Sequence, residues 1–126
     1  MSDHEHATRA EERALIVAEA ARAREVQRAA EARVRNALRA MLAVDARVTA
    51  ATLRWDLWEG DDGEVSLCRT ITARIGGVLW PDDDAGLREM QPQPDWLAFA
   101  DAVDAVRQAS LGASGDDGEE WTEVRS

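Results

Sequence analysis

The sequence has no lysine, no tyrosine, a single cysteine and a single phenylalanine. One cysteine, Cys68, excludes an internal disulfide and any site that needs a pair of thiolates. A chain without disulfides fits a reducing compartment, so we expect a cytoplasmic protein. No apolar run approaches the ~18 residues of a membrane span, and no basic start followed by an apolar centre predicts a signal peptide. We therefore expect no membrane partner.

Residues suited to catalysis or metal binding are scarce or badly placed. Both histidines fall within the first six residues, so neither is expected beside Cys68 or a serine as a general base. No P-loop and no glycine-rich dinucleotide motif occurs. Asp82, Asp83 and Asp84 are adjacent, so they point apart and are expected to cap a helix. The sequence predicts no catalytic residue, no metal site and no cofactor, and we expect a protein that is not an enzyme.

Charge is plentiful but unevenly divided between the two halves. All 15 basic residues are arginine, against 25 acidic residues, and the net charge is −10. Residues 1–50 carry nine arginines and eight acids, a net +1, whereas residues 51–126 carry six arginines and seventeen acids, a net −11. Such asymmetry favours partner binding or self-association. Abundant Ala and Arg without Lys is typical of a GC-rich genome, and an accessory structural protein of a phage or bacterium fits it.

The first third of the chain predicts one long helix. No glycine or proline occurs before Gly60, and alanine, arginine and glutamate, all good helix formers, dominate. Residues 8–11 form a capping box, so we expect a flexible N-terminus over 1–8 and an amphipathic helix over 9–47. Residues 2–5 repeat the same pattern and allow an earlier start. At 1.5 Å per residue, a helix over 9–45 measures roughly 50–55 Å, more than a compact domain of this size spans.

The apolar residues of this helix recur at alternating steps of four and three, as in a heptad repeat. Pairing with another chain is one interpretation, and a lone helix folded onto its own domain is the alternative. Leu38 and Leu42 widen the stripe, so its last part is expected to pack on the body. Gln27 interrupts the stripe, whose members are Ile16, Ala20, Ala23, Ala30, Val34, Ala37, Met41, Val44 and Val48.

A β-hairpin is expected next, within a small body over 48–111. Apolar residues occupy alternate positions in two segments, the pattern of half-buried strands. A three-residue loop, Asp61-Asp62-Gly63 with Gly63 left-handed, places all the core residues on one face. That register pairs Leu57 with Leu67, Trp55 with Arg69, Leu53 with Ile71 and Ala51 with Ala73. It also predicts a cation–π contact between Arg69 and Trp55.

The rest of the body is expected to hold a possible third strand and a second helix. Residues 78–80 predict a short strand, and Pro94 predicts the first turn of a helix over about 94–111. Residues 112–126 are acidic and rich in glycine, which predicts a flexible, disordered tail. The predicted class is therefore α+β, with a long N-terminal helix, an antiparallel hairpin, a C-terminal helix and an acidic tail.

The function favoured by these patterns is a non-catalytic interaction or assembly module that oligomerises or binds a protein partner through its long helix. The alternatives are an acidic inhibitor of a basic partner and nucleic-acid binding through an arginine-rich patch, which the net charge disfavours. Tryptophans outside the core are typical interface anchors, which adds Trp58 and Trp121. The alternative for Trp58 is cover by the second helix or by residues 78–80, and the alternative for Trp121 is docking on the chain's own sheet as an added strand. The predicted partner-binding residues are Ile16, Ala23, Ala30, Val34, Ala37, Met41, Trp58 and Trp121. The predicted basic patch is Arg22, Arg24, Arg28, Arg33, Arg35 and Arg39.

Overall fold

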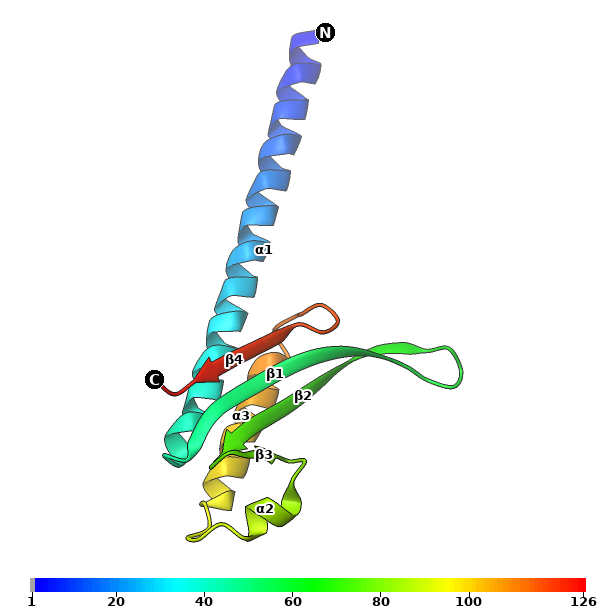
Figure 1. Ribbon diagram of the computed structural model, residues 1–126. Coiled ribbons are helices and arrows are strands. Elements are labelled where there is room, and N and C mark those ends of the chain that lie inside the picture. Colours follow the sequence, from blue (N-terminus) through cyan, green and yellow to red (C-terminus); the bar gives the residue numbers. More distant parts are fainter. Residues whose placement is uncertain (1) are drawn as a thin grey trace.

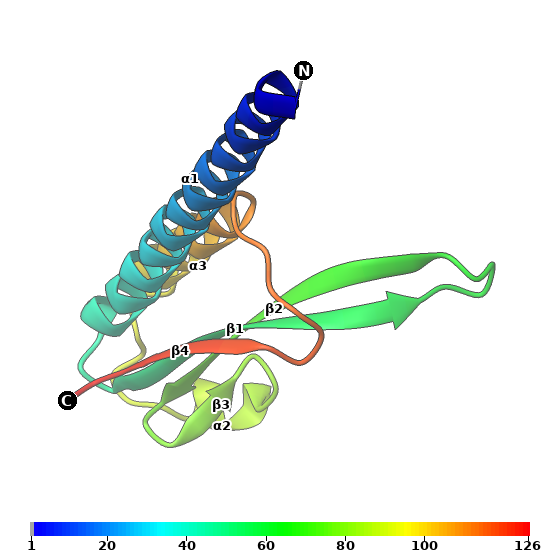
Figure 2. The ribbon, with the colours of Figure 1, turned by 90° about the horizontal axis from the view of Figure 1, so that it is seen from above.

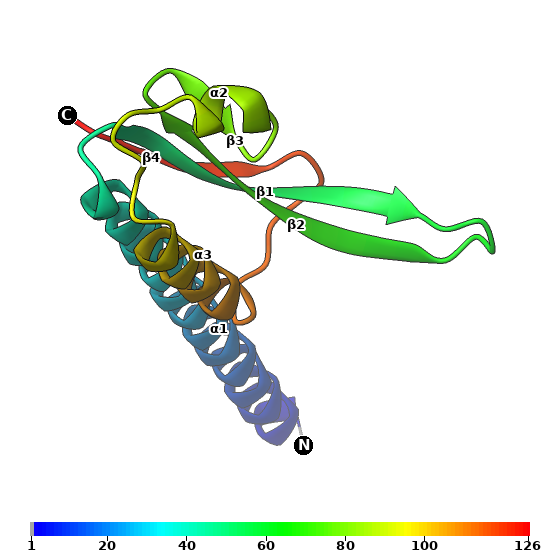
Figure 3. The ribbon, with the colours of Figure 1, turned by 90° about the horizontal axis from the view of Figure 1, so that it is seen from below.

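The chain folds into a sheet layer and a helix layer, from which α1 projects (Figure 1). The computed structural model describes residues 2–126, with side chains from residue 8 onward. Helices α1 and α3 lie side by side against one face of an antiparallel sheet (Figure 3). This arrangement confirms the predicted α+β class. In chain order the elements are α1 (Ser2–Val44), β1 (Val48–Glu59), β2 (Val65–Ile75), β3 (Val78–Trp80), α2 (Asp84–Arg88), α3 (Trp96–Ser110) and β4 (Glu120–Val124).

The strands of the sheet lie in the order β3-β2-β1-β4. The register predicted for the hairpin is confirmed, because Leu57, Trp55, Leu53 and Ala51 pair with their expected partners on β2. The loop is also as predicted. Gly60 N donates to Glu64 O at 2.7 Å, and Gly63 has φ +81°, a conformation that favours glycine. The predicted third strand, β3, pairs with the last residues of β2.

The hydrophobic core lies between the sheet and the two helices. Alternate residues of β1 and β2 point to the same face, and this face is the one that the helices cover. Close packing of large side chains in this layer is the main source of stability for a fold of this size. The largest buried members are Trp55 and Leu53 from β1, Ile75 from β2, Val34, Leu38 and Met41 from α1, and Phe99 and Val106 from α3.

Both helix starts differ from the prediction. Helix α1 begins at Ser2, so residues 2–8 are helical where a flexible segment was predicted, and it ends at Val44 instead of residue 47. The sequence allowed an earlier start at residues 2–5, and Thr8 lies inside the helix. Helix α3 begins at Trp96 because Asp95 is its N-cap, accepting from Ala98 N at 3.1 Å. Met1 lies outside the described residues.

The prediction of a flexible acidic tail over 112–126 is wrong for its second half. Strand β4 pairs antiparallel with β1 along Ala50–Arg54 and forms an edge of the sheet (Figure 2). The Trp121 side chain points to the face of the sheet that the helices cover. There its ring packs edge-on against the ring of Trp55, with 4.4 Å between the ring centroids. The body therefore includes the C-terminal segment and the second half of α1. Composition alone did not show a strand whose partner lies some 70 residues away.

Replacing Trp121 by alanine should strongly destabilise the protein. The side chain is 6% exposed and fills the space beside Trp55, so its loss leaves a cavity and costs about 3–5 kcal/mol. Trp58→Ala is the matched control, since Trp58 is 60% exposed and its removal should change stability by about 0.5 kcal/mol or less. Urea unfolding followed by circular dichroism measures both. Equal losses in the two variants would show that β4 is not docked.

Candidate functional site

Helix α1 leaves the body at Gln27. The Gln27 side chain donates to Ser114 O at 2.7 Å and accepts from Ser114 Oγ at 3.3 Å, and these bonds join α1 to the loop after α3. Every side chain of α1 from residue 8 to residue 26 is exposed. We call this segment, residues 8–26, the rod (Figure 1). It is about 28 Å long, and the body covers none of it.

The predicted stripe is divided at this boundary. Ile16 and Ala23 lie on the rod and are exposed, as a partner-binding role requires. The expectation that Ala30, Val34, Ala37 and Met41 bind a partner is wrong, since the chain's own α3 and sheet cover that part of α1. Ala30, Val34 and Met41 have no exposed surface, and Ala37 is half-buried. The alternative of a helix folded onto its own domain therefore holds for the second half of α1, and pairing of the first half with another chain stays a prediction.

Besides Ile16, the rod carries large aliphatic side chains that the sequence analysis did not select, namely Leu15, Val17 and Val26. Leu15, Ile16, Val17 and Val26 are each between 60% and 65% exposed. Three of them are consecutive, so they spread around the helix, but Ile16 and Val17 lie on or beside the stripe of Ala20 and Ala23. An exposed apolar strip of this kind is typical of an interaction site.

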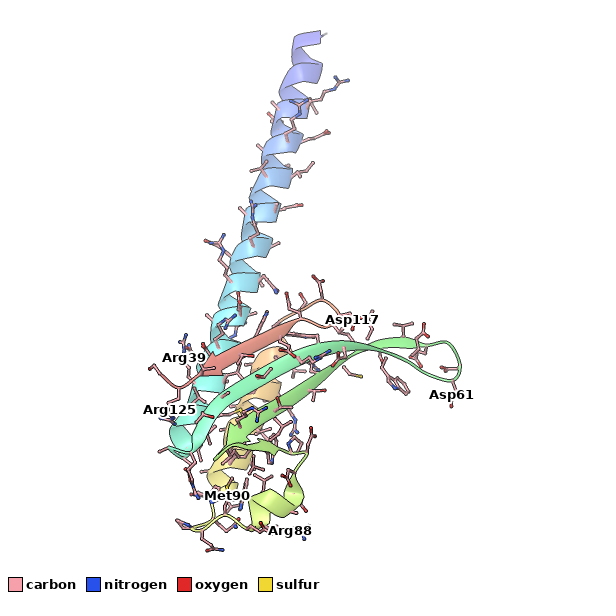
Figure 4. All side chains as sticks on the ribbon, viewed as in Figure 1. Arg39, Asp61, Arg88, Met90, Asp117 and Arg125 are labelled. Carbon is pink, nitrogen blue, oxygen red and sulfur yellow. The ribbon has the colours of Figure 1, made fainter. Side chains whose placement is uncertain are left out.

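The predicted basic patch is partly neutralised inside the chain. Arg39 forms an ion pair with Glu123 of β4 at 2.9 Å, and the two lie where β4 crosses α1 (Figure 4). Arg35 pairs with Glu31 at 3.2 Å and donates to Thr122 O at 3.5 Å. Two of the six predicted arginines, Arg35 and Arg39, therefore contact strand β4 of their own chain. Within the described chain, no ion pair joins Arg22, Arg24, Arg28 or Arg33 to a carboxylate.

A second projecting element is the far half of the hairpin. Strands β1 and β2 have 12 and 11 residues, about 40 Å of strand, whereas α3 is about 22 Å long. Residues 56–67, which we call the arm, therefore extend past the helices, with Asp61 at the tip (Figure 4). The arm contains no basic residue and has five acidic ones, Asp56, Glu59, Asp61, Asp62 and Glu64.

The arm has exposed apolar side chains on both faces. Trp58, a predicted partner-binding residue, is 60% exposed on the face away from the helices. On the opposite face lie Leu57, Val65 and Leu67, between 41% and 54% exposed, which sequence reasoning missed. Comparing strand length with helix length would have found them. Trp121, the other predicted anchor, is buried within the chain and is not available to a partner.

A groove of about 430 Å³ lies where the arm joins the body, between β2 and the C-terminal end of α3. Its apolar lining comes from Leu67, Ile71 and Leu111. Arg69 also lines it, and the predicted cation–π contact with Trp55 is wrong. The guanidinium instead donates to Ser110 Oγ at 3.2 Å, near the negative end of the α3 dipole. The groove continues the apolar face of the arm toward the core.

The direction of α1 is fixed by a polar corner at its C-terminal end. Arg125 donates to the carbonyl oxygens of Leu42 in the last turn of α1, of Asp45 in the connection and of Val48 at the start of β1. Asp45 accepts from the side chain and the backbone of Arg47, and these bonds lower the pKa of its carboxyl from 3.8 to about 2. The same contact raises the pKa of the Arg47 guanidinium.

A similar contact joins β1 to β4. The pKa of the Arg54 guanidinium is raised, chiefly by its hydrogen bond to Asp56 and secondly by its hydrogen bond to Glu120. Arg54 Nη1 and Glu120 Oε1 are 3.0 Å apart across the strand pair. The corner holds the C-terminal end of α1 and the Gln27–Ser114 bonds hold the helix where it leaves the body, so the body sets the direction of the rod.

Comparison with protein-family models, with curated proteins and with solved structures returns no match for this chain. Within residues 2–126, no helix combines the length and hydrophobicity that crossing a membrane requires. A cavity of about 360 Å³ beside Trp121 is lined by Glu31, Asp116 and Glu119. Even so, the described side chains include no group of three or more histidine, cysteine or acidic residues placed to hold a metal ion.

Asp45→Asn should make the protein less stable at neutral pH but not at low pH. Asp45 has a lowered pKa in the folded state, so its charge contributes stability above pH 4 that is lost as the pH falls toward about 2. The gap between wild type and variant should therefore narrow between pH 4 and pH 2. Urea unfolding at a series of pH values measures it, and a gap that stays constant over that range contradicts the role given to this pair.

Proposed function

We propose that this chain is a non-catalytic assembly protein that oligomerises through the rod. The observation behind the proposal is that one apolar stripe runs along α1 from Ile16 to Val44 while the body covers only the part after Gln27. Surface helices normally bury such a stripe, and packing supplies most of their stability. Residues 8–26 have no such packing within the chain, and a partner would provide it.

The composition of the rod suits it to binding. Alanine has the highest helix propensity, so the rod needs less ordering on association than a segment of poor helix formers would need. A surface that is already ordered loses less conformational entropy on association. The small side chains of Ala20 and Ala23 also let another element approach the helix axis closely, while Ile16 and Val17 supply apolar area.

A second candidate function is the blocking of a basic partner by the acidic arm. The observation that favours it is the run of five acidic residues beside the exposed Trp58, with no arginine between residues 55 and 68. Such an interaction would weaken steeply with salt. Nucleic-acid binding has less support, because Arg35 and Arg39 already contact the acidic segment of their own chain.

We place the protein in the cytoplasm. Cys68 is exposed on β2, and a reducing compartment would keep its thiol from forming disulfides between copies.

Glutamates introduced in place of alanines on the stripe should weaken association between copies. Ala20→Glu with Ala23→Glu puts two carboxylates at the centre of the proposed interface, and burying them without partners should weaken association by about tenfold or more. Ala18→Glu with Ala21→Glu is the matched control, because these alanines lie off the stripe on the same helix. Sedimentation velocity over a range of concentrations measures the mass. A wild-type chain that stays monomeric, or equal weakening in both variants, contradicts the proposal.

A further inference from the structure

Two projecting elements of the described chain, the rod and the arm, carry apolar side chains that no other element packs on. One of them is a helix and the other is part of a sheet. The rod is a helix without a sheet, since Ile16 and Val17 are exposed on it. The arm has a sheet face without a helix. Leu57, Val65 and Leu67 lie on the same face as Trp55, but beyond the reach of α3. We call this surface the arm face. Helix stripes and sheet faces are stable when packed on one another.

The body already shows this helix packed on this sheet. The second half of the α1 stripe, including Val34 and Met41, lies in one core cluster with Leu53 and Trp55 of β1. The rod continues the same stripe toward the N-terminus, and the arm face continues the same sheet face toward the hairpin loop. Within one copy the two continuations diverge, because the rod and the arm project in different directions (Figure 1, Figure 2). They cannot meet in the same chain.

We propose that the arm face of one copy receives the rod of a second copy. This inference rests on the proposed function and names the surface that the rod binds. The stripe of the rod would lie on Leu57, Val65 and Leu67, with its end against the apolar groove beside Leu111. The contact repeats the helix-on-sheet packing of the core.

Charge favours this partner over a second rod. At the spacing of the stripe, the positions before Ile16 are Arg13 and Arg9. Two parallel rods would place these arginines opposite their own copies in the seam, where like charges repel. On the arm face they would approach Glu59 and the other carboxylates of the arm, which holds no basic residue. Arg24 flanks the stripe on one side, and Glu12 and Glu19 flank it on the other, so the attraction comes from the two arginines on the line of the stripe.

The apolar area available for burial also favours the arm face over a second rod as the surface that the rod binds. The alanines of the stripe bury little area against each other, so a pair of rods gains little from packing. The three aliphatic side chains of the arm face and Leu111, 64% exposed, offer the larger apolar surface that this stripe lacks.

The test mixes two variants that are each defective in one surface. The rod variant is Ala20→Glu with Ala23→Glu. The arm variant is Leu57→Thr with Leu67→Thr, since threonine suits strands and adds no charge. Leu97→Thr is the control, because Leu97 is 82% exposed on α3, away from the arm. Thermal unfolding of the arm variant should stay cooperative, because Leu57 and Leu67 are 54% and 41% exposed and neither belongs to the buried core cluster.

Each variant alone should associate at least about tenfold more weakly than wild type in sedimentation velocity. Mixed in equal amounts, they should form a heterodimer, because one supplies an intact arm and the other an intact rod. The Leu97→Thr control should associate like wild type. An arm variant that associates like wild type while the rod variant does not would overturn this inference and leave rod-to-rod pairing. Two weak variants that fail to combine would overturn it as well. A monomeric wild type would instead defeat the proposed function.

Discussion

The structure depends on a mismatch of length between a helix and the body that packs against it. Helix α1 has 43 residues and is about 64 Å long, while the body covers it only from Gln27 to Val44, about 27 Å. The covered half supplies core residues such as Val34 and Leu38, so the fold requires it. The other half contributes nothing to the core. A continuous helix links the two, and the body therefore holds the rod in a fixed direction.

The hairpin of the sheet is likewise longer than the helices that cover it. The C-terminal segment neutralises only part of the charge difference between the two halves of the chain. Beyond the end of α3 the hairpin carries apolar and acidic side chains into solvent. At the other end of the sheet, β4 brings Glu123 to Arg39 and closes part of the charge difference within one chain. What remains is a rod whose four arginines and four glutamates balance, with Arg9 and Arg13 on the line of the stripe, and an arm with only acids. Attraction between these two arginines and the carboxylates of the arm favours association between copies.

Local patterns sufficed for most of the fold. Alternation in two segments and Gly63 between them determined the pairing of Leu53 with Ile71, because a shift by one residue would split the core between faces. The helix signal of α1 was equally clear. The strand at Glu120–Val124 was only the alternative to a flexible tail, because its stabilising contacts, Trp121 with Trp55 and Arg54 with Glu120, join residues far apart in sequence. The apolar stripe of α1 likewise did not show at which residue the body stops covering the helix, because this also depends on contacts between residues far apart in sequence. The boundary at Gln27 is set by a bond to Ser114.

Amide hydrogen exchange at several protein concentrations tests the central claim most directly. A helix without packing frays and exchanges quickly, whereas a buried helix is protected by the stability of the whole fold. If copies associate through the rod, exchange over residues 8–26 slows as the concentration rises, while residues 30–44 keep the same protection throughout. Fast exchange over residues 8–26 that is independent of concentration would contradict the account.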